Sequence, residues 1–307
     1  MSLTLHLNRR AFLGAGAATL ATPALAKAPM MGPSAVNFAR FKLGAFEVTT
    51  LLGGSRMAEN PQSIFGMNVD ADTFASWSEE NMIPADKTGF YFTPTLVNTG
   101  DALVLFDTGL GNEALGQAMV AAGYSPDQVD VVVLTHMHPD HIGGMSGDDS
   151  AFPNARYVAG STEYDFWSKL DAGNRVGDMV AAKVKPLAEK FTFVAPGDSP
   201  VSGLTAVDAF GHTPGHMGWM VESDGQQVML AADMANHYVW SLAKPDWEVK
   251  FDMDKAAAAA TRKRLLGMLA ADKIPMIGYH MPFPALGYVA ADGDGFRWVP
   301  ESYQISL

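Results

Sequence analysis

A dense group of metal-capable side chains lies in the segment 135–141, which reads Thr-His-Met-His-Pro-Asp-His. His136 and His138 are two residues apart, so on an extended segment their side chains point the same way and can bind one ion. Asp140 and His141 follow a proline, which we expect to interrupt regular structure and to fix a turn, and they can reach a second ion. Two imidazoles do not complete a four-coordinate or five-coordinate site, so other parts of the chain must supply further ligands.

The element that must position this group is the apolar run 129–134, Val-Asp-Val-Val-Val-Leu, directly before it. A short run rich in β-branched residues predicts a buried β-strand, so we expect the group on a loop at the end of a core strand. Rigid sheets that support solvent-facing loops are common frameworks for functional sites. The alternative is a solvated polar loop without a ligand, but three of the chain's eight histidines fall in this segment, and we favour the metal site.

The pattern His-x-His-x-Asp-His resembles the signature of the metallo-β-lactamase superfamily, in its dinuclear hydrolase branch. Segments that match the rest of the family pattern follow one another in the expected order between about residue 40 and the C-terminus. They are Asp107-Thr108-Gly109, Gly211-His212-Thr213-Pro214-Gly215-His216, Leu230-Ala231-Ala232-Asp233 and Gly278-Tyr279-His280. The resemblance implies a four-layer α/β fold, the αβ/βα sandwich of that family, in which metals lie at one edge between two packed sheets.

The resemblance also implies two groups of metal ligands that share one bridging carboxylate. One metal takes His136, His138 and His212, the other takes Asp140, His141 and His280, and Asp233 bridges them. Imidazole and carboxylate ligands suit zinc, manganese, iron and cobalt alike, and we expect two divalent ions with zinc as the first candidate. The chain has no cysteine, which excludes thiolate ligands and disulfides. Asp107 is expected to support the ligands rather than to bind metal.

The chemistry that the resemblance implies is hydrolysis by a hydroxide held between the two metals, because metal binding lowers the pKa of water to about 7 in favourable zinc sites. The expected catalytic carboxylates are Asp140 and Asp233, with Asp140 either passing a proton to the leaving group or acting as a ligand alone. Within the superfamily the chain is most similar to methyl parathion hydrolase and the N-acyl homoserine lactonases. Besides the metal segment, the similar stretches are 151–155 (Ala-Phe-Pro-Asn-Ala), 165–167 (Asp-Phe-Trp) and 280–284 (His-Met-Pro-Phe-Pro).

We expect the substrate to be a lactone or an ester, most concretely an N-acyl homoserine lactone. The alternative is a phosphotriester such as methyl parathion, and further alternatives are a β-lactam or a non-catalytic metal-binding module. Many lactonases of the family carry a tyrosine three residues after the bridging aspartate, where this chain has Asn236, so lactone chemistry lacks one marker. The expected walls of the substrate pocket are Trp167, Asn236, Tyr238, Phe251 and Phe283, and for each aromatic ring core packing is the alternative.

Composition and the N-terminus predict an exported, acidic protein that acts on a small molecule. The formal net charge of −12 and the lack of basic runs argue against nucleic-acid substrates. Residues 1–26 resemble a twin-arginine signal peptide that ends in Ala-Leu-Ala, which predicts a periplasmic or secreted protein. The apolar stretch of that segment is shorter than the roughly 20 residues of a membrane span, so we expect no stable membrane insertion. A homodimer is suggested by the family alone.

The rest of the sequence predicts a leader over 27–39 and one hydrolase domain over 40–307. We expect a β-hairpin with Gly44 in its turn, an irregular segment over 53–69 and a metal-bearing loop after the strand described above. Helices are expected over 70–82, 112–123, 161–169, 176–190 and 254–271. Hairpins followed by alternating strands and helices fit two packed sheets with helices outside.

Overall fold

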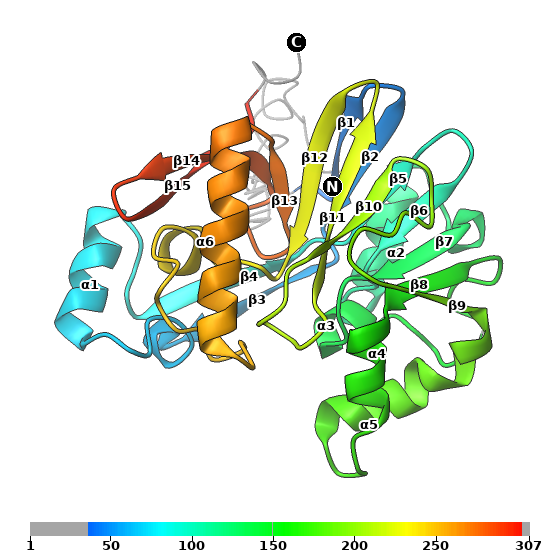
Figure 1. The fold of residues 1–307 in the computed structure, drawn as a ribbon, viewed down its shortest axis with the longest axis horizontal. Helices are drawn as coiled ribbons and strands as arrows, with labels where there is room; N and C mark the ends of the chain where they lie inside the picture. The colour runs from blue at the N-terminus through cyan, green and yellow to red at the C-terminus, as the bar shows by residue number, and fades with distance from the viewer. Residues whose placement is uncertain (1–35, 149, 303–307) are drawn as a thin grey trace, which may run out of the picture. The chain divides into compact units, whose positions relative to one another are not determined.

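The computed structural model describes residues 36–148 and 150–302 (Figure 1). The predicted signal peptide, 1–26, and residues 27–35 of the predicted leader lie outside the described residues, so both remain predictions. The last residues of the predicted leader belong to the first strand, β1, which begins at Phe38.

Two mixed sheets form the framework of the described residues. Within them the first sheet has seven strands in the order β1-β2-β5-β6-β7-β8-β9, and the second has six in the order β10-β11-β12-β13-β14-β15. The bounds are β1 (Phe38–Leu43), β2 (Phe46–Leu51), β5 (Thr95–Asn98), β6 (Leu103–Phe106), β7 (Val131–Leu134), β8 (Arg156–Gly160), β9 (Phe191–Val194), β10 (Leu204–Asp208), β11 (Met217–Ser223), β12 (Gln226–Ala232), β13 (Met276–Gly278), β14 (Leu286–Asp292) and β15 (Gly295–Pro300).

Strand direction determines where functional loops can gather. The neighbours from β6 to β9 are parallel, and so are β12 and β13, whereas the remaining pairs in the two sheets are antiparallel. The predicted hairpin of β1 and β2 is confirmed, and Gly44 occupies its turn with a φ of 58°, a left-handed conformation that glycine adopts without strain. Because parallel strands present their carboxyl ends at one sheet edge, the loops after β7, β12 and β13 can lie near each other.

The described residues form six α-helices besides the strands. They are α1 (Ala71–Glu80), α2 (Glu113–Ala121), α3 (Pro139–Ile142), α4 (Ser161–Ser168), α5 (Arg175–Lys183) and α6 (Lys255–Asp272). Asn112 and Asp254 begin α2 and α6 as N-caps, each accepting a hydrogen bond from a backbone N–H two or three residues later. Figure 1 shows α2 and α4 beside the first sheet and α6 beside the second, which confirms the predicted four-layer arrangement.

The strand β7 is buried on both faces, which explains why its apolar run is unbroken. Val131 and Val133 pack into the core between the two sheets, with residues of the second sheet such as Trp219. Val132 and Leu134 pack on the opposite face, against a cluster that includes residues of α2, α4 and α5. The strand that carries the metal-capable loop is therefore held from both sides.

The segment 53–69, predicted to be irregular, contains a strand, so this prediction was wrong. The strand β3 (Gly54–Glu59) pairs antiparallel with β4 (Lys87–Phe92) in a separate two-stranded ribbon. The sequence did not indicate β3 because its side chains are mostly exposed and do not alternate between apolar and polar residues. The ribbon is stabilised mainly through β4, whose Phe90 and Phe92 belong to a third hydrophobic cluster.

The helix predicted over 176–190 is two elements, because α5 ends at Lys183 and a 3₁₀ segment follows over Lys185–Lys190. Pro186 accounts for the break, since its nitrogen has no N–H with which to continue the α-helical hydrogen bonds. The longest helix, α6, is the alanine-rich one and buries Leu265, Leu266 and Leu269. In the stretches 36–148 and 150–302, no helix combines the length and the apolar character needed to cross a lipid bilayer.

Candidate metal centre

The seven predicted metal ligands come from the loops that follow β7, β10, β12 and β13. Their ligand atoms converge in two groups, and the atoms of each group lie within 4.8 Å of one another. The first group is His136, His138 and His212, and the second is Asp140, His141, Asp233 and His280. The structure thus brings together all seven side chains that the resemblance implied, whereas their assignment as ligands stays a prediction.

The short helix α3 explains how neighbours in sequence reach different groups. His136 and His138 lie between β7 and α3, with His138 in an extended conformation, whereas Asp140 and His141 lie on the single turn of α3. Pro139 was expected to interrupt regular structure and to fix a turn, and in the structure it begins the one-turn helix α3. Proline is favoured at the first helical position, where its missing N–H would have no helical partner in any case.

Asp233 lies between the two groups. Its Oδ2 is 3.3 Å from His212 Nε2 and 4.0 Å from His136 Nε2 on the side of the first group. On the side of the second group, Oδ2 is 3.2 Å from His280 Nε2 and Oδ1 is 3.2 Å from His141 Nε2. This position is the one that a carboxylate bridging two ions would take.

Unsatisfied buried atoms show that these residues fit bound cations. Among the described residues, His136 Nε2, His141 Nε2 and Asp233 Oδ1 are buried and have no hydrogen-bond partner. A buried polar atom without a partner costs about 1–3 kcal/mol, so three in one place require an explanation. All three point into the two groups of ligand atoms. Divalent cations would satisfy them, because imidazole nitrogen and carboxylate oxygen are common ligands of such ions.

The pKa shifts of the predicted ligand imidazoles differ in direction: burial opposes protonation of His141 and His280, yet the nearby carboxylates raise the pKa of both. Burial holds the pKa of His136 and of His138 well below the ordinary value, so both imidazoles are neutral and offer a lone pair. Burial opposes ionisation of Asp233, but His280 and His141 outweigh it and hold the pKa of Asp233 well below its ordinary range. Burial likewise opposes protonation of His212, yet Asp233 and Asp252 raise its pKa to about 9. A metal bound at His212 would displace this proton.

Carboxylates outside the two groups orient the ligands. Asp107 Oδ2 lies 2.7 Å from His141 Nδ1, and both oxygens of Asp107 accept hydrogen bonds from Thr135. Asp252 Oδ1 lies 3.0 Å from His212 Nδ1, and its Oδ2 accepts a hydrogen bond of 2.7 Å from Arg262. Such partners fix the ring orientation of a metal-binding histidine and raise its basicity. The supporting role expected of Asp107 agrees with these contacts.

Asp252 and Arg262 were missed by the sequence analysis. Asp252 lies 40 residues from His212 in the chain, and no local motif connects them. Arg262 is 0% exposed on an otherwise alanine-rich and leucine-rich helix. A cation on the apolar face of α6 is the one signal that could have indicated a buried partner.

Among the described residues, the two histidines outside the ligand groups form hydrogen bonds with the backbone instead. His216 Nδ1 donates to the Ala209 carbonyl at 2.9 Å, and its Nε2 accepts from the Asp233 N–H at 3.1 Å. His216 is therefore neutral, in line with a pKa that burial lowers to about 3. His237 accepts hydrogen bonds from the Val239 and Trp240 N–H groups at the start of a one-turn π-helix over Tyr238–Leu242.

A cavity of about 680 Å³ lies beside both ligand groups and is lined by His138, Asp140, Asp233 and His280. Its further wall comes mainly from the β3–β4 ribbon and neighbouring loops. The apolar members are Met57, Ala58, Ile64, Phe90, Phe92, Leu110, Val176 and Phe251. Such a mixture of apolar wall and a few convergent polar groups is usual in small-molecule sites.

Of the five predicted pocket residues, Phe251 lines this cavity. Trp167 is 4% exposed, and its indole N–H donates to Glu163 at 2.7 Å while its ring packs edge-on to His138. Asn236 is buried and donates to Asp233 Oδ2 at 3.0 Å. Tyr238 stacks on His237. Neither these three nor Phe283 lines the cavity, so their contact with substrate stays a prediction.

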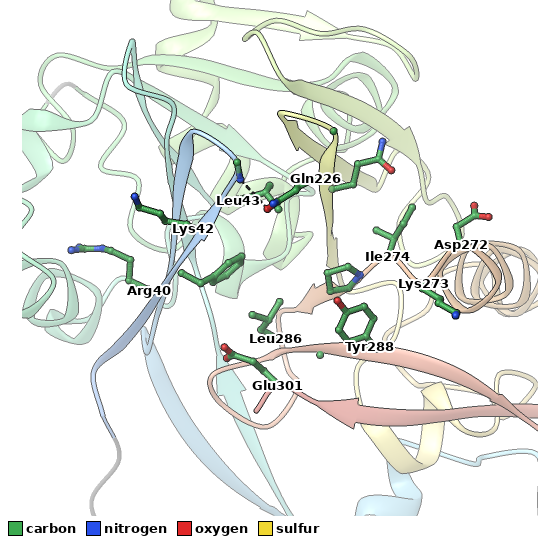
Figure 2. Close-up of a pocket in the computed structure, with 16 residues that line it drawn as sticks. Arg40, Lys42, Leu43, Gln226, Asp272, Lys273, Ile274, Leu286, Tyr288 and Glu301 are labelled. Atoms are coloured by element: carbon green, nitrogen blue, oxygen red, sulfur yellow. Dashed lines mark hydrogen bonds between the residues drawn. The ribbon is translucent and has the colours of Figure 1, made fainter. Parts of the chain in front are cut away.

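A larger cavity among the described residues lies elsewhere and does not share a lining residue with the metal groups. It has a volume of about 850 Å³ between the β1–β2 hairpin, the end of α6 and β14 (Figure 2). Its wall includes Leu43, Leu286 and Tyr288, and Gln226 accepts a hydrogen bond there from the Gly44 N–H at 3.0 Å. Because neither metal-capable group of the described residues borders this cavity, we place the chemistry at the smaller one.

Comparisons with known proteins agree with this geometry. A family model described as the metallo-beta-lactamase superfamily matches residues 93–275. The N-acyl homoserine lactonase AttM of Agrobacterium fabrum (strain C58) is 31% identical over 121 residues, which are 38% of this chain and 44% of AttM. The match therefore spans less than half of that relative.

Two solved structures resemble nearly the whole chain. The lactonase AidC, a dizinc quorum-quenching enzyme in complex with a product, N-hexanoyl-L-homoserine, has a TM-score of 0.80 and 29% identity over 87% of this chain and 98% of AidC. The hydrolase AbOPH of the beta lactamase superfamily has a TM-score of 0.79 and 24% identity over 88% of this chain and 99% of AbOPH. At the latter identity the likeness concerns the fold alone.

Proposed function

The chain belongs to the metallo-β-lactamase superfamily as a metal-dependent hydrolase, and we propose that it opens the ring of N-acyl homoserine lactones. The observation that carries the proposal is the likeness to AidC, which covers 87% of this chain and 98% of AidC. We further propose two zinc ions as the cofactor, as in that dizinc relative.

The shape and lining of the cavity support a substrate with an acyl chain. Phe90 and Phe92 present their rings beside His280, with centroids 5.7 and 5.3 Å from the imidazole. Met57 and Phe251, which are 66% and 41% exposed, continue the apolar lining outward. An acyl chain that covered these side chains would gain about 0.8 kcal/mol for each buried methylene group. The polar lactone ring would then lie at the opposite end, over the metal groups.

The catalytic roles follow from the residues that face the cavity. The two ligand groups would hold the metals, which when bound would lower the pKa of a water and polarise the ester carbonyl. Asp140 lines the cavity with a side chain that is 21% exposed, and its Oδ2 is 3.4 Å from His280 Nε2. We assign to Asp140 the proton that the attacking water loses. As the ring C–O bond breaks, Asp140 returns that proton to the ring oxygen, which becomes a hydroxyl group.

The test is a comparison of kcat/KM on the metal-analysed protein with three substrates: a long-chain acyl homoserine lactone, an aryl ester and methyl parathion. We expect the lactone to have the highest kcat/KM by a wide margin. Dominance of methyl parathion would replace the proposal by phosphotriester hydrolysis. Low and similar rates on all three, with two metals bound, would mean that the substrate belongs to another class.

A pocket variant tests the placement of the acyl chain. Phe251→Ala should lower kcat/KM for a long-chain lactone by roughly tenfold and leave a short-chain lactone within about twofold, because about 1–2 kcal/mol of apolar contact is lost. Phe193→Ala is the matched control, since Phe193 is 38% exposed and does not line the cavity. An equal loss for both chain lengths would refute the placement.

A further inference from the structure

Glu163 in α4 is a buried carboxylate whose two oxygens accept four hydrogen bonds. Oε1 accepts from the Met137 N–H at 2.9 Å and from the Trp167 indole N–H at 2.7 Å. Oε2 accepts from the Thr213 hydroxyl at 2.7 Å and from the Gly215 N–H at 3.0 Å. The ionised carboxylate is the form that four donors fit, although burial raises the pKa of Glu163.

Three of the four donors lie on the two loops that carry the first ligand group, and the fourth, Trp167, lies on α4 itself. Met137 lies between His136 and His138, and Thr213 directly follows His212. Gly215 packs so closely on α4 that an added methyl group would overlap the Glu163 backbone. The two loops are 74 residues apart in sequence, counted from His138 to His212, yet the Glu163 side chain accepts hydrogen bonds from both.

The contacts of Glu163 concern the first ligand group only. Trp167, which Glu163 holds, packs edge-on to His138 with ring centroids 5.9 Å apart. The hydrogen bonds of Glu163 do not involve residues of α3 or of the loops that carry Asp233 and His280. The second group has a different support, because Asp107 lies 2.7 Å from His141 Nδ1.

Stability alone does not account for a carboxylate in this position. Glu163 is 1% exposed and has no cationic partner among the described residues. Burying a charge without a counter-ion is costly, and well-packed apolar side chains commonly serve stability as well or better. A rigid acceptor that ties together two loops is useful where ligand geometry must be held closely.

We propose that Glu163 is a positioning residue for the metal bound by His136, His138 and His212. Its carboxylate fixes the distance between the loop after β7 and the loop after β10, whereas Asp107 supports the second group through its direct contact with His141 Nδ1. The inference rests on the ligand assignment proposed above but not on the lactone substrate. It can therefore fail or hold whatever the substrate is.

The experiment measures zinc retained per protein, by elemental analysis, after the holoenzyme is equilibrated with graded concentrations of a chelator. Glu163→Gln keeps the shape of the side chain but turns an amide N–H₂ toward donors. We expect this variant to bind one zinc equivalent roughly 10–100-fold more weakly than the unmodified protein does, so that the chelator removes this equivalent at a lower concentration. The affinity of the other equivalent should be unchanged. His138→Ala and His280→Ala identify which equivalent belongs to the first group and which to the second.

Two further variants make the result decisive. Glu222→Gln, at an exposed glutamate of β11, is the matched control and should retain both equivalents. Asp107→Asn should weaken the other equivalent instead. Retention of both zinc equivalents by Glu163→Gln, or equal weakening of both, would overturn the proposal. If Glu163→Gln does not fold, Thr213→Val decides, since it removes one of the four bonds: weakening of the first equivalent supports the proposal, and unchanged binding refutes it.

Discussion

Arg262 lies beneath the metal centre, and its removal should destabilise the protein more than any change at an exposed arginine. The side chain is 0% exposed and donates to Asp252 Oδ2 at 2.7 Å. It also donates to the backbone carbonyls of Pro245 at 2.9 Å and Trp247 at 3.3 Å. In Arg262→Met the apolar side chain retains much of the volume, but Asp252 is left as a buried carboxylate without its cation.

The magnitude follows from the burial of both partners. Asp252 is 3% exposed, so solvent cannot replace the lost guanidinium. Breaking a buried ion pair by removing one partner costs about 3–5 kcal/mol. We therefore expect the free energy of unfolding to fall by about that amount. In a domain of this size the melting temperature should fall by roughly 6–20 °C.

The assay is urea denaturation of metal-loaded protein, followed by a thermal melt at the same metal concentration. The control is Arg264→Met on the same helix, because Arg264 pairs with Asp208 at 2.8 Å while both side chains are nearly half exposed. An exposed pair of this kind contributes at most about 1 kcal/mol. The two arginines thus differ in burial but not in helix or in type of partner.

A double-mutant cycle gives the result that would refute the reasoning. Asp252→Asn with Arg262→Met removes both charges, so its destabilisation should be smaller than the sum of the single changes by about 1–3 kcal/mol. Additive effects would show that Asp252 and Arg262 are not coupled. A cost below about 1 kcal/mol for Arg262→Met alone would equally contradict a buried pair.

Two further predictions concern titration and metal content. Burial lowers the pKa of His237 to about 3, against an ordinary value of 6.5, so between these values the unfolded chain binds a proton that the folded chain does not. The contribution of His237 to the free energy of unfolding should therefore fall by about 1.4 kcal/mol for each unit by which the pH drops from 6.5 toward 3. His237→Asn keeps an acceptor for the Val239 N–H and should reduce the slope of unfolding free energy against pH by the same amount, about 1.4 kcal/mol per unit. Identical slopes for the variant and the unmodified protein in denaturation series would contradict this prediction. His138→Ala should lose at least one metal by elemental analysis and nearly all hydrolysis, and full activity with normal metal content would exclude the ligand assignment.

The metal segment could be predicted from sequence because its chemistry is local. His136, His138, Asp140 and His141 lie within six residues, and the apolar run before them predicts the strand that supports them. The more distant ligands, such as Asp233, were identified through the family pattern rather than through spacing. The hairpins and helices were likewise signalled by turn residues, N-caps and hydrophobic periodicity.

The surroundings of the site depend on contacts between distant segments, which local patterns do not encode. Glu163 meets Gly215 across 52 residues, and neither residue belongs to a recognisable local motif with the other. The ribbon strand β3 is exposed and lacks alternation, so its part in the cavity could not be predicted. Trp167 was expected to face substrate, but the hydrogen bond to Glu163 and the packing on His138 account for its burial.

The two strands of the β3–β4 ribbon contact different parts of the site, and this affects how the substrate range of the enzyme can change. The inner strand β4 contacts a predicted metal ligand, because the Tyr91 carbonyl lies 2.8 Å from His280 Nδ1. The outer strand β3 contributes Arg56, Met57 and Glu59 to the cavity wall, and all three are exposed. Exposed positions tolerate replacement at little cost in stability. Variants randomised over β3 should therefore differ in substrate range while the predicted metal ligands stay unchanged. New substrate specificities can then arise from a few substitutions.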